Sequence, residues 1–298
     1  NQIKICFISF LSYHLFDPKT KAEFGGAELQ LYYLGTELAK DPRFDVSFVT
    51  SDFQQPDQQV IEGVSLFKLR SPSQGIKYLR TLHEYLRLWR LMKKIDADVY
   101  IQRAAGMITG MVSLFCRIYG KKFIYMTAHD NDIIRDKRPG WMSSALIGAL
   151  IWESFKFGLR SAKVIIVQHQ QQRDNLRNYY GKDGIIRASA HRMPEDHALS
   201  DKDFVLWVAR CEEWKQPELF IELAKAFPVE RFCMVCPRAL DGDYFNRIKS
   251  RASALSNVTF IEYVPFNEID DYFLKAKIFV NTSKAEGFPN TFIQSAKA

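Results

Sequence analysis

The chain has 298 residues, of which 47% are hydrophobic and 25% charged, and its formal net charge is +7 at pH 7. This composition is typical of a globular protein and excludes a disordered or collagen-like chain. The length exceeds what one hydrophobic core normally organises, so we expect two domains of about 150 residues. The longest apolar run, Ala145 to Trp152, is far shorter than the ~18 residues that a membrane-spanning helix needs. The first residues predict a buried strand rather than a signal peptide, and together these features indicate a cytoplasmic protein.

Apolar runs rich in Val, Ile and Phe alternate with amphipathic stretches along the first 180 residues. The runs predict strands and the amphipathic stretches predict helices. In chain order the expected elements are strand 3–10, helix 27–40, strands 45–50 and 64–69, helix 77–95, strand 98–102, helix 106–119, strand 122–128, helix 142–160, strand 163–167 and helix 169–180. Such alternation predicts a parallel sheet with helices on both faces.

A polar segment, residues 187–203, interrupts this alternation, and we expect the interdomain linker there. The pattern then restarts as strand 204–209, helix 217–226, strand 231–236, helix 242–253, strand 258–262, helix 267–274, strand 277–281 and a helix from about Asn290. The sequence therefore predicts two α/β domains, residues 1–190 and 191–298, rather than one barrel. Because a doubly wound domain normally has five or six strands, we expect the second domain to be C-terminally incomplete.

The five cysteines are scattered and lie mostly in apolar stretches, which does not favour a disulfide framework. Cys233 and Cys236 form a Cys-x-x-Cys pattern, but inside an expected strand. Residues three apart in a strand point to opposite faces, and no second cysteine pair or nearby histidine completes a zinc site. We therefore expect no metal site there.

The positive charge is concentrated in one segment. Eight Lys and Arg residues lie between Lys68 and Lys94 against the single acidic Glu84, which accounts for the whole net charge of +7. From Tyr78 onward the apolar residues follow helical spacing, with a basic opposite face. One interpretation is a solvated surface helix, and the other is a contact of Lys77–Lys94 with an anionic partner such as a phosphate-bearing lipid or membrane surface. Nucleic acid is disfavoured because no recognition motif for it accompanies the patch.

In a doubly wound domain ligands bind at the carboxyl ends of the strands, so the loops after the strands are the candidate sites. Neither the dinucleotide-binding Gly-x-Gly-x-x-Gly pattern nor the P-loop pattern occurs. Gly25 and Gly26 directly precede the first expected helix, where the backbone can approach a ligand closely and free N–H groups can face a phosphate. His129 ends another expected strand, a position where a histidine is often structural.

Two further segments follow strands of the second domain. Arg210 and Lys215, five residues apart at a strand–loop–helix junction, can converge on one anion. Glu286 lies in a glycine-containing loop, in the segment Glu-Gly-Phe-Pro-Asn-Thr, and Gln294 follows eight residues later. A carboxylate followed by a helix start suits a ligand rich in hydroxyl groups.

Taken in order, these segments resemble the retaining glycosyltransferases of family four, and the resemblance covers nearly the whole chain. It implies the GT-B fold, an α/β architecture of two doubly wound Rossmann-like domains facing across a cleft. It also implies a metal-independent enzyme of the hexosyltransferase type, without a cofactor, that moves a sugar from a nucleotide diphosphate sugar to a sugar or lipid-linked acceptor. A role in polysaccharide or glycoconjugate synthesis follows from the same resemblance.

The resemblance also implies roles for single residues. Arg210 and Lys215 would bind the donor diphosphate and neutralise the charge that develops as it leaves. Glu286 would hold hydroxyl groups of the donor sugar, and His129 would lie near the transferring sugar. The implied contacts with the donor or the acceptor come from Gly25, Gly26, Gly287, Phe288, Asn290, Thr291 and Gln294.

Gln294 departs from the family pattern, which usually has a second glutamate at this position in contact with the nucleotide ribose. A neutral amide still hydrogen-bonds ribose hydroxyls, but it loses a charge-assisted bond, so weaker nucleotide affinity is expected.

Two alternatives remain open. A metal-dependent glycosyltransferase would hold a divalent ion with an Asp-x-Asp triplet, such as Asp130 to Asp132, Asp96 to Asp98 or Asp241 to Asp243. The other alternative is a non-catalytic binding protein or an inactive two-domain fragment that retains nucleotide-sugar binding.

Overall fold

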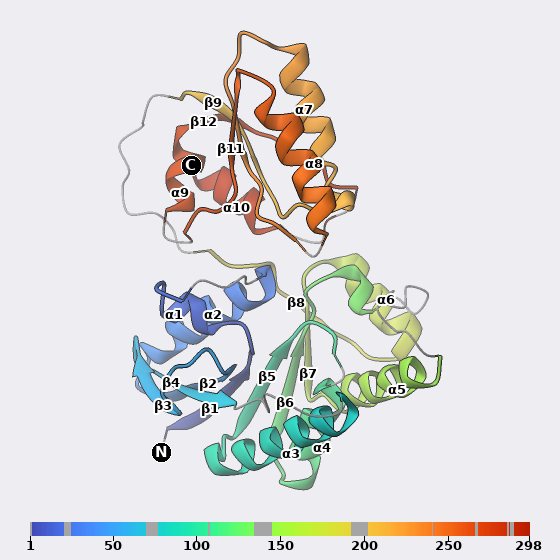
Figure 1. Cartoon of the computed structure of the whole chain (residues 1–298). Helices are drawn as coiled ribbons and strands as arrows, with labels where there is room; N and C mark the ends of the chain where they lie inside the picture. Colours follow the sequence, from blue (N-terminus) through green and yellow to red (C-terminus); the bar gives the residue numbers. More distant parts are fainter. Residues whose placement is uncertain are drawn as a thin grey trace. The chain divides into compact units, whose positions relative to one another are not determined.

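The structure is a computed structural model that describes residues 2–20, 25–69, 77–106, 108–133, 145–191, 202–239, 241–265, 268–284, 286 and 289–298. The chain divides into two compact units, Asn1–Ala190 and His191–Ala298 (Figure 1). The boundary falls inside the polar segment 187–203. Each unit has its own sheet, so each is an α/β domain with its own core.

The first unit contains an eight-stranded sheet in the order β3-β4-β2-β1-β5-β6-β7-β8. Its strands are β1 (Ile3–Ile8), β2 (Phe44–Ser51), β3 (Gln58–Ile61), β4 (Val64–Leu69), β5 (Val99–Arg103), β6 (Lys122–Met126), β7 (Val164–Val167) and β8 (Ile185–Ile186). All neighbours pair in parallel except β3 and β4. The tight turn between these two places Glu62 and Gly63 at φ 50° and 76°, the left-handed geometry that matches the twist of a hairpin.

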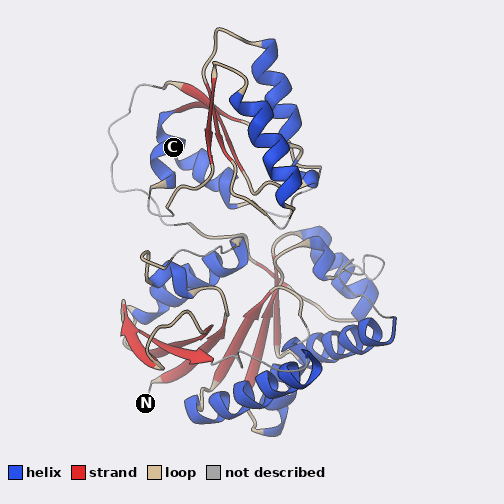
Figure 2. Ribbon diagram, viewed as in Figure 1, coloured by secondary structure: helices blue, strands red, loops and turns tan. Residues whose placement is uncertain are grey.

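The helices of the first unit are α1 (Tyr13–Phe16), α2 (Gly26–Ala39), α3 (Lys77–Ile95), α4 (Ile108–Ile118), α5 (Ala145–Ser161) and α6 (Gln170–Tyr180) (Figure 2). The five helices expected from the sequence are present. The additional α1 is a single turn, too short to produce a periodic pattern. None of the helices in the described ranges is long and apolar enough to cross a membrane.

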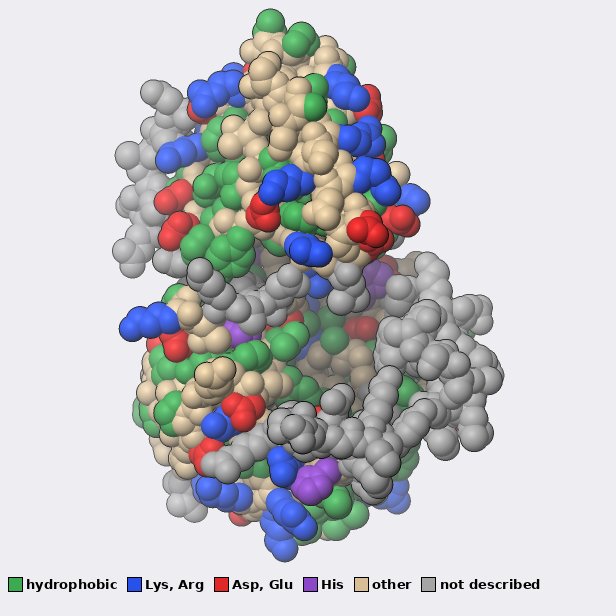
Figure 3. All heavy atoms as spheres, in the orientation of Figure 1, with side chains coloured by type: hydrophobic (Ala, Val, Ile, Leu, Met, Phe, Trp, Pro, Cys, Tyr) green, Lys and Arg blue, Asp and Glu red, His purple; other side chains and the backbone are tan. Residues whose placement is uncertain are grey.

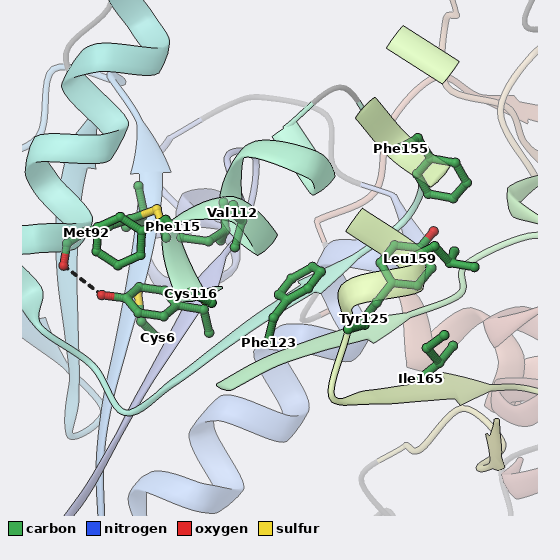
Figure 4. Packing of buried hydrophobic residues seen from close by; sticks show 14 of the residues in the cluster. Cys6, Met92, Val112, Phe115, Cys116, Phe123, Tyr125, Phe155, Leu159 and Ile165 are labelled. Carbon is green, nitrogen blue, oxygen red and sulfur yellow. Dashed lines mark hydrogen bonds between the residues drawn. The ribbon is translucent and has the colours of Figure 1, made fainter. Parts of the chain in front are cut away.

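The first sheet is covered on both faces, as the alternating pattern predicts. On one face α3, α4 and α5 pack over a core that includes Tyr100, Phe115 and Phe155 (Figure 4). The Tyr100 hydroxyl is buried there and donates a hydrogen bond of 2.7 Å to the Met92 carbonyl, so its polar end is satisfied. On the other face Phe7 and Phe48 stack at 4.6 Å between ring centroids, beneath α2.

The second unit contains a four-stranded, fully parallel sheet in the order β11-β10-β9-β12. Its elements are β9 (Phe204–Val208), α7 (Pro217–Ala226), β10 (Phe232–Val235), α8 (Gly242–Ser253), β11 (Val258–Ile261), α9 (Ile269–Lys275), β12 (Ala276–Phe279) and α10 (Asn290–Lys297). Helices α7 and α8 cover one face, and α9 and α10 lie on the other (Figure 1). Cys236 packs in the first of these cores and Cys233 in the second, which confirms that the Cys-x-x-Cys side chains point to opposite faces.

Helices α4 and α5 touch at their backbones, and glycines make this contact possible. A Cβ atom at Gly158 would lie 2.7 Å from the backbone carbon and oxygen of Thr109. Backbone atoms cannot rotate away as a side chain can, so the two helices would have to separate.

Gly158→Ala therefore tests this contact. Alanine raises helix propensity by about 1 kcal/mol, whereas overpacking costs about 1–3 kcal/mol or more. Because the obstructing atoms are backbone, we expect a net loss of about 1 kcal/mol or more in the free energy of unfolding, measured in urea. Gly106→Ala is the control, since a Cβ there would have no neighbour closer than 3.9 Å. A more stable Gly158→Ala variant would contradict the close contact.

Candidate active site

The predicted donor residues of the second unit lie at the carboxyl edge of its sheet. Strands β9 and β12 are parallel neighbours, so the loops that follow them leave the sheet side by side. Arg210 and Lys215 come from the loop after β9, and Glu286 comes from the loop after β12. Residues 71 positions apart in the sequence are thereby brought into contact.

The ion pair between Lys215 and Glu286 is the centre of this site. Lys215 Nζ lies 2.5 Å from Glu286 Oε1, and the two side chains are only 15% and 18% exposed. The ammonium group also lies 3.7 Å from the centroid of the Trp214 ring, within the range of a cation–π contact. Burial lowers the pKa of Lys215, while the hydrogen bond that Lys215 donates to Glu286 acts in the opposite direction. The carboxylate therefore stabilises a cation that has little access to water.

Arg210 lies beside this pair and is more open to solvent. Its side chain is half exposed, and its guanidinium lies 3.3 Å from Glu212 Oε1. The other carboxylate oxygen of Glu212 accepts a hydrogen bond from Trp214 Nε1 at 2.5 Å. Glu212 thus holds both Arg210 and the indole ring on which the Lys215 ammonium rests.

The backbone around Lys215 is fixed by the segment that follows β12. The Thr282 hydroxyl donates to the Lys215 carbonyl at 2.6 Å, and the backbone N–H of Lys284 donates to the Trp214 carbonyl at 2.9 Å. The next residue, Gln216, has left-handed backbone angles, φ 49° and ψ 54°, which non-glycine residues rarely adopt. Pro217 then begins α7, a position where its fixed φ is favourable.

The start of α10 carries three more of the predicted donor residues. Asn290 and Thr291 form its first turn, where they can present backbone N–H groups. Gln294 is only 5% exposed, and its Nε2 donates to Asp270 Oδ1 at 2.8 Å. Lys297 Nζ lies 2.6 Å from the other oxygen of Asp270. The predicted contacts of Gly287 and Phe288 lie outside the described residues.

Gly25 and Gly26 lie where the first unit begins α2, as the sequence predicts. The Glu28 carboxylate accepts a hydrogen bond of 2.9 Å from the Gly25 N–H. A Cβ at Gly25 would lie 3.0 Å from that same carboxylate oxygen, so glycine allows the close approach. One of the amides expected to face a ligand is therefore occupied by a side chain of the helix itself.

His129 also lies at the carboxyl edge of the first sheet, after β6. It is half-buried, and its backbone N–H donates to Asp132 Oδ2 at 3.1 Å. His129 and the Gly25–Gly26 turn therefore lie at the same edge of the sheet. The strands that precede them, β6 and β1, are not neighbours, because β5 lies between them.

The Asp-x-Asp triplets have structural roles. The buried Asp132 carboxylate accepts from the backbone of residues 128 and 129, and burial raises the pKa of this group. Asp130 accepts from Gln172 Nε2 at 2.8 Å and lies 3.0 Å from His169 Nε2.

Aspartates of the other two triplets also make ion pairs or hydrogen bonds within their own units. Asp96 pairs with Lys121 at 2.7 Å, Asp98 accepts from the Lys4 N–H, and Asp241 caps the start of α8. In the described part of the chain, no three His, Cys, Asp or Glu side chains are grouped as metal ligands. These observations do not favour the Asp-x-Asp alternative.

Four further residues that build the site were not predicted from the sequence, namely Glu212, Trp214, Asp270 and Thr282. Glu212 and Trp214 lie between Arg210 and Lys215 in the sequence, and this position alone could have indicated that they belong to the site. Thr282 is a polar residue just after an apolar strand, where ligands and loop contacts gather. Asp270 is brought near α10 only by the packing of α9 against that helix, which no sequence pattern reports.

Comparisons with known proteins agree with this architecture. The sequence profile of the family described as Glycosyltransferase Family 4 matches residues 24–187, and that of Glycosyl transferases group 1 matches residues 189–298. A search of curated protein sequences finds no match.

Several solved structures share the fold of the whole chain. Sucrose-phosphate synthase from Thermosynechococcus elongatus has a TM-score of 0.72 and 18% identity, over 99% of this chain and 79% of that chain. A glycosyltransferase from Rickettsia africae has a TM-score of 0.65 and 14% identity, over 100% and 77%. The catalytic domain of starch synthase IV from Arabidopsis thaliana, bound to ADP and acarbose, has a TM-score of 0.65 and 10% identity, over 99% and 81%.

Identities this low show a shared fold, which is GT-B, and the family is shown by the profile that matches more than half of the chain. The chain belongs to glycosyltransferase family 4 and is a glycosyltransferase that uses a nucleotide-sugar donor.

Proposed function

We propose that the protein is a retaining glycosyltransferase of polysaccharide or glycoconjugate synthesis, with its donor site in the second unit. The observation that supports this most directly is the contact between Lys215 and Glu286, with Arg210 beside it, at the carboxyl edge of a parallel sheet. Lys215, a cation that can bind a diphosphate, thus lies next to Glu286, a carboxylate that can bind sugar hydroxyls. The donor is a nucleotide diphosphate sugar, and the acceptor is a hydroxyl of a sugar or of a lipid-linked sugar.

In this mechanism catalysis is mainly electrostatic. As the bond to the leaving group breaks, positive charge builds on the sugar and negative charge on the diphosphate. Arg210 and Lys215 stabilise the diphosphate, and preorganised charges of this kind are usually the largest contribution to such a reaction. An ammonium has three N–H donors, so Lys215 can bind a phosphate oxygen and keep its contact with Glu286. On this proposal the two cations serve where other glycosyltransferases use a divalent ion.

The start of α10 adds phosphate contacts to the proposed donor site, and residues of the first unit have a separate proposed role. The N–H groups of Asn290 and Thr291 bind phosphate, and Glu286 orients the donor sugar through its hydroxyls. Gly25, Gly26 and His129 contribute to the side that receives the acceptor and the transferring sugar. Starch synthase IV, which shares this fold, has been solved with ADP bound, and we propose a nucleoside diphosphate as the product here as well.

Arg210→Ala and Lys215→Ala test the donor site. Each should lower the release of nucleoside diphosphate from the best of UDP-, GDP- and ADP-glucose by about 10²-fold or more, because loss of one transition-state contact typically costs that much. Thermal unfolding of Arg210→Ala should stay close to that of the wild type, because the Arg210 side chain is half exposed. Lys215→Ala leaves the mostly buried Glu286 without its lysine, so we expect a lower unfolding temperature for this variant and compare activities below it. Arg231→Ala removes a cation from the exposed pair with Asp203 and serves as the control. Near-normal turnover in both site variants would exclude the proposed role.

Gln294 has a structural reason to be neutral in this chain. Its amide donates to a carboxylate, Asp270, that also binds Lys297. A glutamate at this position would place a buried carboxylate against the partly exposed carboxylate of Asp270. The two like charges repel, which favours proton binding by the buried one.

Gln294→Glu is therefore expected to destabilise the second unit at pH 7 by about 1–3 kcal/mol, the usual cost of an unsatisfied buried polar contact. The introduced carboxyl would have a raised pKa in the folded state, so the penalty is present at high pH and is lost as pH falls through that pKa. Urea unfolding at pH 7 and pH 4.5 measures the free energy of unfolding with and without this penalty. Gln294→Met removes the amide without adding a carboxylate, so it gives the effect of losing the amide alone. A glutamate variant that equals the wild type at both pH values would contradict the interpretation.

We also propose that α3 contacts an anionic membrane surface. Leu88 and Met92 are buried on one face of the helix, while His83, Leu86, Arg90, Lys93 and Lys94 are exposed on the other. Leu86, at 50% exposure, places an apolar group among cations, a combination typical of helices that lie on lipid. Figure 3 shows Lys and Arg side chains gathered at the end of the first unit where α3 lies.

A hollow beside this helix strengthens the proposal. It has a volume of about 430 Å³ and is lined by Asp57, Phe67, Lys68, Leu69, Arg87, Arg90, Leu91 and Lys94. Its cations outnumber the single carboxylate, and its apolar walls suit the region just below a phosphate headgroup. Arg90 and Lys94 belong both to the hollow and to the exposed face.

The triple variant Arg90→Glu, Lys93→Glu and Lys94→Glu should lose binding to vesicles of phosphatidylglycerol and phosphatidylcholine by about 100-fold or more, since each cation near such a surface contributes about 1 kcal/mol. Co-sedimentation with vesicles measures this loss of binding. Neither the wild type nor the triple variant should bind vesicles of phosphatidylcholine alone. Reversal of Arg231, Arg247 and Lys249 in the second unit matches the change in net charge and should have a small effect. Equal losses in the two triple variants would show that net charge, not α3, determines binding.

A further inference from the structure

We propose that Thr282 is a positioning residue for Lys215, acting from the neighbouring strand through the backbone. This inference rests on the proposed function, in which Lys215 binds the donor diphosphate. Thr282 follows β12, and its hydroxyl joins a buried tryptophan of β9 to the Lys215 carbonyl. In this proposal Thr282 does not bind the donor diphosphate itself. It acts by fixing the position of Lys215.

The chemistry of the three groups fixes the direction of these hydrogen bonds. The Trp207 Nε1–H donates to Thr282 Oγ1 at 2.9 Å, and Thr282 Oγ1 donates to the Lys215 carbonyl at 2.6 Å. An indole N–H can only donate and a carbonyl can only accept, so a hydroxyl is needed between them to do both. Trp207 is 1% exposed and packs in the core under α7 and α8, which makes it a rigid anchor.

The backbone at Lys215 needs such an anchor. Gln216 holds a left-handed conformation directly after it, and strained backbone persists only where surrounding contacts impose it. The Thr282 hydroxyl and the Lys284 N–H impose it from across the loop, because they hold the carbonyls of Lys215 and Trp214.

The same short segment also holds the partner of Lys215. Asn281 Nδ2 donates to Glu286 Oε1 at 3.4 Å, and Asn281 Oδ1 accepts from the Ser283 N–H at 2.8 Å. Residues 281–284 therefore set the backbone of the cation and the side chain of its carboxylate together. A shift of this segment would change the distance between Lys215 and Glu286 even with both residues intact.

Thr282→Val and Thr282→Ser test the proposal, because valine keeps the shape of threonine without the hydroxyl and serine keeps the hydroxyl. The probe is inorganic pyrophosphate, measured by calorimetry, which reports the diphosphate site without a base or sugar. We expect valine to weaken pyrophosphate binding about tenfold and serine to restore it to within about threefold. We also expect valine to lower kcat for diphosphate release from the best nucleotide sugar by about 10²-fold, the size of effect that a 1 Å misplacement produces, with a smaller change in KM.

Thr259→Val is the matched control, since it makes the same change at an exposed position of β11 in the same sheet. Thermal unfolding of each variant identifies any variant that fails to fold. If Thr282→Val fails to fold, Trp207→Phe replaces it; this change removes the indole N–H donor together with part of the volume of a buried ring. If wild-type protein binds pyrophosphate and Thr282→Val binds it equally well, Thr282 does not position Lys215. If wild-type protein does not bind pyrophosphate at all, the donor-site assignment itself is wrong.

Discussion

The ion pair of Lys215 and Glu286 is the interaction that organises the candidate site in the second unit. A lysine with so little exposure would tend to lose its charge, because burial penalises the ionised form. Glu286, 2.5 Å away, favours the charged form, and the Trp214 ring adds a favourable face. The resulting cation is held in place before any ligand arrives. Such preorganisation is what makes a fixed charge effective toward a leaving diphosphate, since the protein does not have to reorganise during the reaction.

This pair exists because of strand order. Parallel strands send their following loops to one edge of the sheet. Because β12 lies beside β9, two loops meet that the sequence separates by α7, β10, α8, β11, α9 and β12 itself. The contacts of Thr282 and Lys284 then fasten one loop to the other. In the first unit the same rule brings the Gly25–Gly26 turn and His129 to one edge of the sheet, where β5 lies between the strands that precede them.

Much of this architecture was predictable from hydrophobic periodicity. Nearly every strand and helix expected from the sequence is present, with ends shifted by a few residues, and the parallel sheets follow from the alternation. The misses are short or polar elements: the four-residue α1, the polar β3 with its hairpin, and the two-residue β8. For the candidate site, residue type and position after a strand singled out Arg210, Lys215 and Glu286, which the fold places at one edge of the second sheet. Thr282 and Asp270 were missed because their roles arise from tertiary contacts. Gln294, which departs from the family pattern, is explained by Asp270, a neighbour that only packing reveals.

A crystal structure of the protein with an intact nucleotide sugar, such as UDP-, GDP- or ADP-glucose, would show which side chains bind the donor. We expect the diphosphate within hydrogen-bond distance of Lys215 and Arg210, and the sugar hydroxyls on Glu286. The hydrogen bond from Thr282 to the Lys215 carbonyl should be retained. A nucleotide sugar bound elsewhere in the second unit, with the Lys215–Glu286 pair closed and untouched, would contradict this donor site.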